Sequence, residues 1–595
     1  MRNSFSSKAA FIQRLIEAFE NDHIDLPRID WDCPKGSEVP EFLAKACPPN
    51  HLAYEEARKL FNSKFQLFPL AIIFCSCIDH IRIAIREASD AGIALRVRSG
   101  GHDHEGESSE TDALLIDLSM LNRVEVDNSN GIARIEPGIS FEKLTATLAR
   151  HGVMIPHGTC ATVCIGGFSM GGGWGPWTRK HGMCCEHIIG ATIILANGDV
   201  KQARMNGEEA EQQLLWAIKG GGGFSYGIVT DLLIKTFELP EEMYRFSVTW
   251  NPNPKYPGDP TKSEFSDNEK RELPSPALTP TLGILDAWEK AIRDTSSVEA
   301  NQLVGTNLKI YARPPIETGS FNPETIGHGC VMYGYWEGKR SSLEAFIKKL
   351  AAASGAQPGS YTTTIGRPVG KDFDYESGSL MNDWDRTSSH EFTTLHRGQR
   401  TAYQTENGDN SPELESAEPF NPDVEGRQAH KITSRLVNAN GLGREGQFKL
   451  IKSLTSPLIH EENLESKLYT YVTLGAITGN YYQNEIREEE KRQSAFPYKD
   501  SLYTIQYQTW WGIEDGDSGE TINDHTNRHL NRALDWMTEC RDYSIPNTSG
   551  AFISFKDSSI ATRTYFDKSY ERLVEIKETH SQDPDNLFQT RKTIT

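Results

Sequence analysis

The chain has 595 residues, of which 37% are hydrophobic and 24% charged, and its formal net charge is −20. This length predicts two domains or more, because single hydrophobic cores stop growing beyond about 300 residues. The acidic balance argues against a nucleic acid or an anionic membrane as partner, since phosphate binding requires concentrated Lys and Arg. The longest apolar run, 67–77, is about half the length of a bilayer span.

The first 44 residues form a predicted extension that contains one amphipathic helix. Its apolar side chains recur at helical spacing, at Phe11, Ile12, Leu15, Ile16 and Phe19. The stretch lacks the uninterrupted apolar core and the small-residue cleavage site of a signal peptide. The ten cysteines include no C-x-x-C pair. The lack of a signal-peptide pattern and the lack of a paired cysteine pattern both favour a reduced, cytoplasmic protein.

Residues 45–240 alternate short apolar runs with helical stretches and glycine turns, which is typical of a mixed α/β domain. "PLAIIFC" and "ALRVRSGG" predict strands, and the helix between them ends at Gly92. Residues 241–523 contain runs rich in Tyr, Thr, Val and Ile, such as "LVGTNLKIYAR" and "DSLYTIQYQTWW", which predict strands interleaved with helices. Pro-rich or acidic composition predicts exposed insertions near 251–278 and 404–428.

Glycine clusters are the most informative feature of the sequence. They occur at Gly100-Gly101, within 158–175 and within 218–230. Glycine lets the backbone approach a ligand and point successive N–H groups at it, so three clusters predict a long cofactor with a pyrophosphate. None of them fits the Rossmann or P-loop fingerprint. The cofactor site is therefore expected to be of another kind.

Four segments share a characteristic order and spacing. They are "RVRSGGHDHEG" (96–106), "GTCATVCIGG" (158–167), "LLWAIKGGGGFSYGIVT" (214–230) and "YERLVEIKETHSQDPDNLF" (570–588). Together they resemble the berberine bridge enzyme-like branch of the FAD-linked oxidases, in the vanillyl-alcohol oxidase/p-cresol methylhydroxylase superfamily. The resemblance covers about residues 45–240 and 525–595 and leaves the region between them loosely similar.

The resemblance implies an α+β fold in two parts. A p-cresol methylhydroxylase-type FAD-binding domain would comprise 45–240 and a C-terminal segment, 524–595, that returns to it. A substrate domain, 241–523, would contribute an antiparallel sheet covered by helices. The implied activity is that of an FAD-dependent oxidoreductase acting on a small organic molecule.

The same resemblance implies that FAD is bound covalently at two points, through His102 to the flavin 8α-methyl and through Cys160 to flavin C6. The chemistry is reasonable, since a thiolate attacks an electron-poor ring and an imidazole an activated methyl group. Cys164 is a rival for Cys160. The further residues expected at the cofactor are Arg98, Ser99, Gly100, Gly101, Asp103, Gly106, Val163, Gly166, Gly167, Gly171, Gly172, Gly173, Gly227, Val229 and Asn586.

Val163 indicates which electron acceptor reoxidises the flavin. In the resembling family, valine at this position goes with dioxygen access and bulkier leucine with dehydrogenases. We therefore expect an oxidase that releases hydrogen peroxide and acts on a natural-product intermediate, an alcohol or a C–N bond. A dehydrogenase with another acceptor, a carbohydrate oxidase and a flavoprotein without catalysis are the alternatives. We expect no metal, because His151, His157 and His181 do not form a ligand pattern.

The substrate side departs from the family pattern. Phe555 stands where the family has its base-forming tyrosine, Phe168 replaces a histidine at the flavin, and Thr504 stands where the family has a lysine. Gln506 and Gln508 share one face of a predicted strand with Thr504, and Gln506 could orient a substrate. The catalytic candidates are Gln506, Tyr471 and Tyr335. Hydride removal requires a proton acceptor, and the possible bases are Tyr471, Tyr335, Tyr333 and Glu337, with water or the substrate itself as alternatives, whereas Gln506 cannot be the base. For His104 two interpretations are open, a neighbour of the flavin or an exposed turn residue, and the exposed turn residue is preferred.

Overall fold

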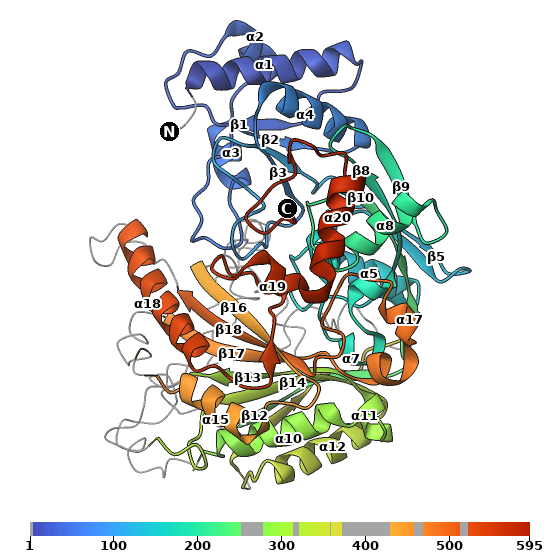
Figure 1. Ribbon diagram of the computed structural model, residues 1–595, viewed down its shortest axis with the longest axis vertical. Helices are drawn as coiled ribbons and strands as arrows, with labels where there is room; N and C mark the ends of the chain where they lie inside the picture. The colour runs from blue at the N-terminus through green and yellow to red at the C-terminus, as the bar shows by residue number, and fades with distance from the viewer. Residues whose placement is uncertain are drawn as a thin grey trace, which may run out of the picture.

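The computed structural model describes residues 4–250, 278–312, 321–357, 359–371, 429–456, 458, 468–511 and 522–595. The protein has an α+β fold built from three main sheets. Two smaller sheets form the body at the top of Figure 1, and a large antiparallel sheet forms the body below it. The predicted insertion 404–428, and residues 251–277 of the other one, lie outside the described residues.

The first sheet has four short strands in the order β1 (Ile29–Trp31), β2 (Ala71–Phe74), β4 (Leu114–Asp117) and β3 (Leu95–Arg98). β2 and β3 run parallel to β4, and β1 pairs antiparallel with β2. The predicted N-terminal helix is present as α1 (Phe5–Asn21), whose apolar side chains are buried next to α4 (Ile78–Ala91). Because β1 extends this sheet, the N-terminal extension forms part of the first body.

The second sheet is antiparallel, in the order β5 (Val124–Asp127), β6 (Ile132–Ile135), β10 (Ile228–Lys235), β8 (Ile188–Ile194) and β9 (Val200–Arg204). Three helices occur in the segments that connect its strands, namely α5 (Phe141–Arg150), α6 (Ile165–Met170) and α8 (Glu209–Ile218). A two-stranded pair joins β7 (Val153–Met154) and β11 (Phe237–Glu238). Gly100 and Gly101 follow β3, the cluster within 158–175 spans α6 and the loops on either side of it, and the last cluster lies in the loop between α8 and β10.

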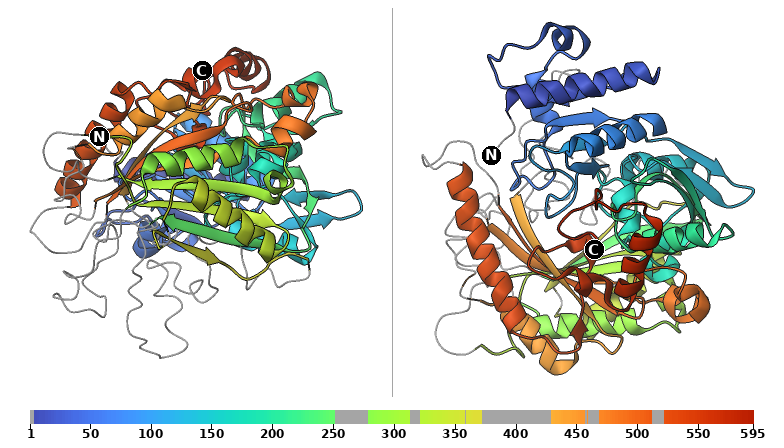
Figure 2. Two further views of the ribbon diagram at one scale, coloured as in Figure 1. Left: turned by 90° about the horizontal axis from the view of Figure 1, so that it is seen from below. Right: turned by 45° about the horizontal axis from the view of Figure 1, so that its top comes forward.

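The third sheet is antiparallel throughout and has eight strands. Their order is β15 (Tyr361–Ile365), β12 (Met243–Trp250), β14 (Cys330–Glu337), β13 (Leu303–Tyr311), β17 (Leu468–Ala476), β18 (Tyr503–Trp511), β16 (Ala429–Val437) and β19 (Thr548–Ser549). One face is covered by α10 (Thr281–Arg293), α12 (Arg340–Ala353), α15 (Gly443–Ser453) and α18 (Ile522–Asp542) (Figures 1 and 2). The opposite face packs toward the first body.

The C-terminal return begins later than the sequence predicts. α18 packs on β16 and β18, and β19 pairs with β16, so residues 522–549 belong to the large sheet. The chain then passes through a short 3-10 turn, η5 (Ile553–Phe555), to α19 (Thr562–Phe566) and α20 (Tyr570–His580), and α20 packs on α8 of the first body (Figure 1). The predicted boundary at 524 falls inside α18, whose sequence pattern does not tell which body the helix covers.

Arg179 fastens the two bodies together. It lies in α7 (Thr178–His181), and its guanidinium is fully buried and donates to the backbone carbonyls of Ile292 and Ala300, both at 3.2 Å. Further donated bonds reach Leu303 and Asp294. Burial lowers the pKa of Arg179 to about 10, which leaves it charged at neutral pH. Within the described ranges, no helix is both long enough and apolar enough to cross a membrane.

Candidate active site

A cavity of about 360 Å³ lies between the two bodies. One wall, the loop wall, consists of the turn after β3, the loop before α6 and the glycine loop before β10. The other, the sheet wall, consists of side chains from β13, β17 and β18. The C-terminal segment closes one side with residues 552–556 and Thr590. Every glycine cluster that the sequence singled out contributes to this cavity.

His102 is held in place by its neighbours on the loop wall. The turn that carries it is anchored by Arg98, whose Nε and Nη2 donate to Asp117 at 2.8 and 2.6 Å inside the first sheet. Gly101 has φ +72°, a left-handed conformation that glycine adopts without strain. The His102 ring stacks on Phe61 with 4.1 Å between centroids, and its Nε2 lies 2.9 Å from Thr162 Oγ1. The His102 ring also lines the cavity.

Cys160 lies in the same cavity and contacts the same threonine. Its Sγ is 3.7 Å from Thr162 Oγ1, so one hydroxyl lies between the two predicted attachment points. Cys164 also lines the cavity, but its thiol donates to Gly138 O at 3.3 Å, and burial raises its pKa to about 12. Because the thiolate is the reactive form, Cys164 is a poor nucleophile at neutral pH, and Cys160 is the better candidate.

The residues predicted at the cofactor divide into two groups. The cavity is lined by Ser99, Gly100, Gly101, His102, Asp103, Cys160, Val163, Gly167, Gly171, Gly227 and Val229. Arg98, Gly106, Gly166, Gly172, Gly173 and Asn586 do not line it. Asn586 instead accepts a hydrogen bond from Lys577 at 2.6 Å, and Gly173 packs against Cys184, where a Cβ would lie 2.5 Å from the cysteine Cβ. These six therefore shape the loops behind the wall.

The loop wall fits a large planar ligand that approaches the backbone. Gly100, Gly167 and Gly223 line the cavity and remain exposed, and a Cβ added to Gly167 would meet nothing within 4 Å. Gly227, with φ +153°, turns the last loop into β10, where a Cβ would lie 2.6 Å from Ile193 and Ile194. A bare backbone beside His102 and Cys160 is therefore suited to holding FAD.

The sheet wall presents hydrogen-bonding side chains in register. The cross-strand pairing places Lys309 opposite Thr473 and Thr473 opposite Gln506. Two residues further along these strands, Tyr471 Oη donates to Gln508 Oε1 at 3.2 Å. The Gln508 side chain also accepts from Trp510 Nε1 and donates to Thr473 Oγ1, both at 3.0 Å. The prediction that Gln506 and Gln508 share a face is confirmed, because both line the cavity.

The predicted proton acceptors lie in different places. Tyr471 lines the cavity, whereas Tyr335 is fully buried beneath it, 6.3 Å from the Trp177 ring. Tyr333 is not part of the cavity lining, and Glu337 forms an ion pair with Lys180. Phe555 lines the cavity and packs edge-on against Phe552 at 5.2 Å. Tyr471 is thus the one of the four predicted bases that reaches the site.

The sequence interpretation missed a pair of histidines. His104 lines the cavity, and its Nδ1 lies 2.8 Å from Nε2 of His430, which stacks on Trp510 at 3.9 Å. Burial lowers the pKa of His104 to about 4, so its ring is neutral at neutral pH. The interpretation of His104 as an exposed turn residue is therefore wrong. Its partner is 326 positions away, and nothing in the local pattern of the turn indicates it.

Lys309 and Asn307 were also missed. Both lie on β13, line the cavity and are only 6% exposed. The ammonium group of Lys309 lies over the rings of Tyr471 and Tyr333, at 5.1 and 5.6 Å from their centroids. Alternation along "LVGTNLKIYAR" could have placed both residues on one face, but not the choice of which face meets the cavity.

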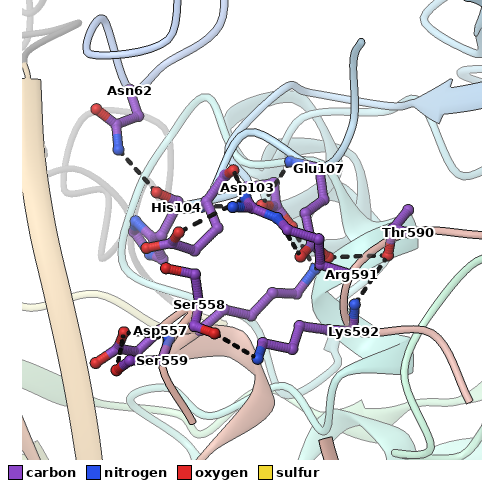
Figure 3. A network of polar contacts seen from close by, with 12 residues as sticks. Asn62, Asp103, His104, Glu107, Asp557, Ser558, Ser559, Thr590, Arg591 and Lys592 are labelled. Carbon is purple, nitrogen blue, oxygen red and sulfur yellow. Dashed lines mark hydrogen bonds and ion pairs between the residues drawn. The ribbon is translucent and has the colours of Figure 1, made fainter. Parts of the chain in front are cut away.

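A network of charges ties the C-terminal segment to the loop wall (Figure 3). Lys556 pairs with Asp103 at 2.5 Å and Glu107 at 3.2 Å. Lys431 of β16 pairs with Asp557 at 3.0 Å and also contacts Glu105. The network continues through Thr590, whose hydroxyl donates to Glu107 at 2.9 Å, and through Arg591, which donates to the carbonyl of Glu105 at 2.7 Å. Three segments distant in sequence are thus joined at the edge of the cavity.

Comparison with known proteins agrees with this arrangement. A family model described as an FAD binding domain matches residues 69–204, and one described as berberine and berberine like matches residues 551–595. The chain is 24% identical over 555 residues to the FAD-linked oxidoreductase pynB of Aspergillus niger, covering 92% of this chain and 88% of the relative.

Solved structures show the same fold. Berberine bridge enzyme from Eschscholzia californica is similar with a TM-score of 0.67 at 20% identity over 98% of both chains. Glucooligosaccharide oxidase from Acremonium strictum, an enzyme with a 6-S-cysteinyl, 8α-N1-histidyl FAD, is similar with a TM-score of 0.64 at 18% identity over 100% of this chain and 99% of that one. The fold and the matched segments define an FAD-linked oxidoreductase. Within this class, the matched C-terminal segment is similar to the berberine bridge enzyme-like proteins.

Proposed function

We propose that this protein is an oxidase with FAD attached covalently to His102 and Cys160. The observation that carries the proposal is that both side chains line one cavity and contact the same hydroxyl, Thr162 Oγ1, at 2.9 and 3.7 Å. The exposed backbone of Gly167, where an added Cβ would meet nothing within 4 Å, leaves room for a ring system beside them. The doubly attached FAD of the Acremonium strictum oxidase supports the same interpretation.

When bound, FAD accepts a hydride from a small organic substrate and passes two electrons to an acceptor, for which we propose dioxygen, giving hydrogen peroxide. Val163 lines the cavity, in keeping with an acceptor that must reach the ring. The sheet wall would hold the substrate against the loop wall. We assign Gln506 to orienting it and Tyr471, in its deprotonated form, to receiving its proton. Gln508 fixes the Tyr471 hydroxyl by accepting its hydrogen bond.

The substrate is expected to be a conjugated or aromatic natural-product intermediate. Aromatic side chains line much of the cavity, and they include Phe61, Phe168, Trp174, Trp510, Phe552 and Phe555. Flat aromatic walls favour a ring-containing or conjugated substrate. A carbohydrate is the second candidate, because a glucooligosaccharide oxidase is among the structures of this fold.

Acid precipitation tests the proposed attachment. Wild-type protein should carry its flavin into the pellet, and His102→Ala and Cys160→Ala should each retain it through the remaining bond. The double variant should release it. The matched control is Cys164→Ala, which should retain both bonds, because the Cys164 thiol is protonated and bonded to Gly138. Retention of flavin by the double variant would contradict the assignment.

The acceptor needs a separate measurement. After anaerobic reduction by a substrate, mixing with air-saturated buffer should reoxidise the flavin rapidly and release one peroxide per turnover. Slow reoxidation by dioxygen, together with fast reoxidation by a quinone or dye, would make the protein a dehydrogenase instead. A panel that includes both oligosaccharides and conjugated alcohols would separate the two substrate candidates.

A further inference from the structure

We propose that Thr162 is a positioning residue for the covalent attachment of FAD, and that its hydroxyl orients His102 and Cys160 together. This inference rests on the proposed function, since it concerns how those two bonds form. Thr162 Oγ1 lies 2.9 Å from His102 Nε2 and 3.7 Å from Cys160 Sγ. His102 and Cys160 line the cavity and Thr162 does not, so its hydroxyl contacts both side chains without occupying the space of the cofactor.

The backbone on either side of Thr162 is fixed by the start of α5. The backbone N–H of Phe141 donates to the Val163 carbonyl at 2.9 Å, and that of Glu142 donates to the Ala161 carbonyl at 3.1 Å. The first N–H groups of a helix have no partner inside the helix, so these bonds satisfy them and hold the loop against α5. The Thr162 side chain is therefore presented from a braced segment of the loop wall.

The turn that carries His102 packs directly on the same loop. A Cβ added to Gly100 would lie 3.1 Å from the Thr162 carbonyl oxygen, so a larger residue would push the two segments apart. The Phe61 ring stacks on the His102 ring with 4.1 Å between centroids. His102 is thus held on one face by Phe61 and at Nε2 by Thr162.

One hydroxyl can serve both side chains because it donates one hydrogen bond and accepts another. A thiolate only accepts, so Thr162 would donate to Cys160 Sγ and accept from the Nε2–H of His102. The bond donated to sulfur favours the thiolate, which is the nucleophilic form. The bond accepted from His102 keeps the proton of the neutral ring on Nε2, and this determines which nitrogen carries the lone pair.

Both attachments have the same overall chemistry. Each breaks one C–H bond of the flavin together with the N–H of His102 or the S–H of Cys160, and forms one N–C or S–C bond. The two electrons and two protons that are released reduce dioxygen, the acceptor proposed above, to one molecule of hydrogen peroxide. Thr162 supplies none of these atoms. Its hydroxyl orients the two nucleophiles, so it should affect the rate of attachment and not the affinity for FAD.

Timed incorporation of FAD tests the proposal, with full-length protein produced under riboflavin limitation and then supplied with FAD in air. Thr162→Val keeps the shape of the side chain and removes the hydroxyl, so incorporation should slow about fivefold or more. Acid precipitation measures the covalent fraction, and the His102→Ala and Cys160→Ala backgrounds report each bond separately. Thr162→Ser should restore most of the rate. The matched control Thr147→Val removes a hydroxyl that donates to the Lys143 carbonyl at 2.8 Å within α5, and should leave the rate unchanged.

The affinity for FAD is measured separately. In the His102→Ala/Cys160→Ala double variant, where FAD is held without covalent bonds, adding Thr162→Val should leave the Kd from flavin fluorescence unchanged. A Kd that rises in proportion to the slower incorporation would show that Thr162 shapes the FAD site instead, and would overturn the proposal. A thermal melt checks folding, and Thr162→Ala, which also lacks the hydroxyl, replaces Thr162→Val if that variant does not fold.

The outcomes separate this inference from the function on which it rests. Wild-type protein that incorporates no covalent flavin would refute both. Wild-type protein that forms the bonds, with Thr162→Val forming them at the same rate, would overturn the inference alone. Slowing at only one of the two attachment points, or no recovery in Thr162→Ser, would do the same, because the proposed hydroxyl serves both nucleophiles.

Discussion

The two walls of the cavity are built by different means. The loop wall combines exposed backbone with the side chains of His102 and Cys160, for which we propose flavin attachment, all within the segments 96–106, 158–175 and 218–230. The sheet wall uses side chains alone, drawn from β13, β17 and β18 and placed by their register. Binding by backbone groups depends little on the neighbouring side chains, so such a wall can keep the same cofactor when those side chains change. Binding by side chains can be altered by single substitutions that leave the fold unchanged, so the substrate can vary.

The largest effect should come from the sheet wall. Tyr471→Phe is expected to lower the rate of anaerobic flavin reduction by about 10²-fold or more, because a positioned proton acceptor contributes that much to catalysis. Stopped-flow absorbance with a substrate measures it. The matched control is Tyr311→Phe, a neighbouring ring at 5.9 Å that does not line the cavity and should reduce the rate far less. A similar loss in both variants would mean that packing, not proton transfer, is responsible.

A smaller effect is expected at the joint that holds the C-terminal segment against the loop wall. Burial acts to raise the pKa of Asp557, but Lys431 and the donors of Ser559 outweigh it and lower the pKa to about 2. A depressed carboxyl pKa stabilises the fold above its unfolded pKa, near 4, and this contribution is lost as the pH falls through 2.

Asp557→Asn should therefore cost about 2 kcal/mol of unfolding free energy at pH 7 and roughly half of that at pH 3. Urea unfolding of variant and wild type at several pH values measures the difference. Asp585→Asn, an exposed residue in the same segment, should show no such trend. A cost that did not depend on pH would show that the network does not act through the charge of Asp557.

The smallest effect tests the backbone character of the loop wall. Gly167→Ala adds one methyl group that meets no protein atom within 4 Å, and because Gly167 lies in α6, folding stability should not fall and should rise by at most about 1 kcal/mol. If FAD lies against this backbone, the flavin content of purified protein should fall severalfold, as the ratio of flavin to protein absorbance would reveal. Gly167→Ala protein with full flavin content would place the ring elsewhere along the wall.

The sequence by itself determined the loop wall. His102, Cys160 and the glycine turns are recognisable because a turn and the residue it presents are neighbours in the chain. It also predicted the α+β class and the shared face of Gln506 and Gln508, since alternation along one strand is local. The predicted helix at the N-terminus is present for the same reason.

Only the tertiary structure determined which side chains form the sheet wall and which distant segments contact one another. Tyr471 and Tyr335 both have strand-like surroundings in sequence, but pairing and register bring one into the cavity and bury the other. His104 meets His430, and Lys309 and Asn307 meet the cavity, through contacts between segments hundreds of residues apart. Alternation fixes which side chains share a face, whereas which face meets the cofactor depends on how whole sheets pack, and that information is distributed over both bodies.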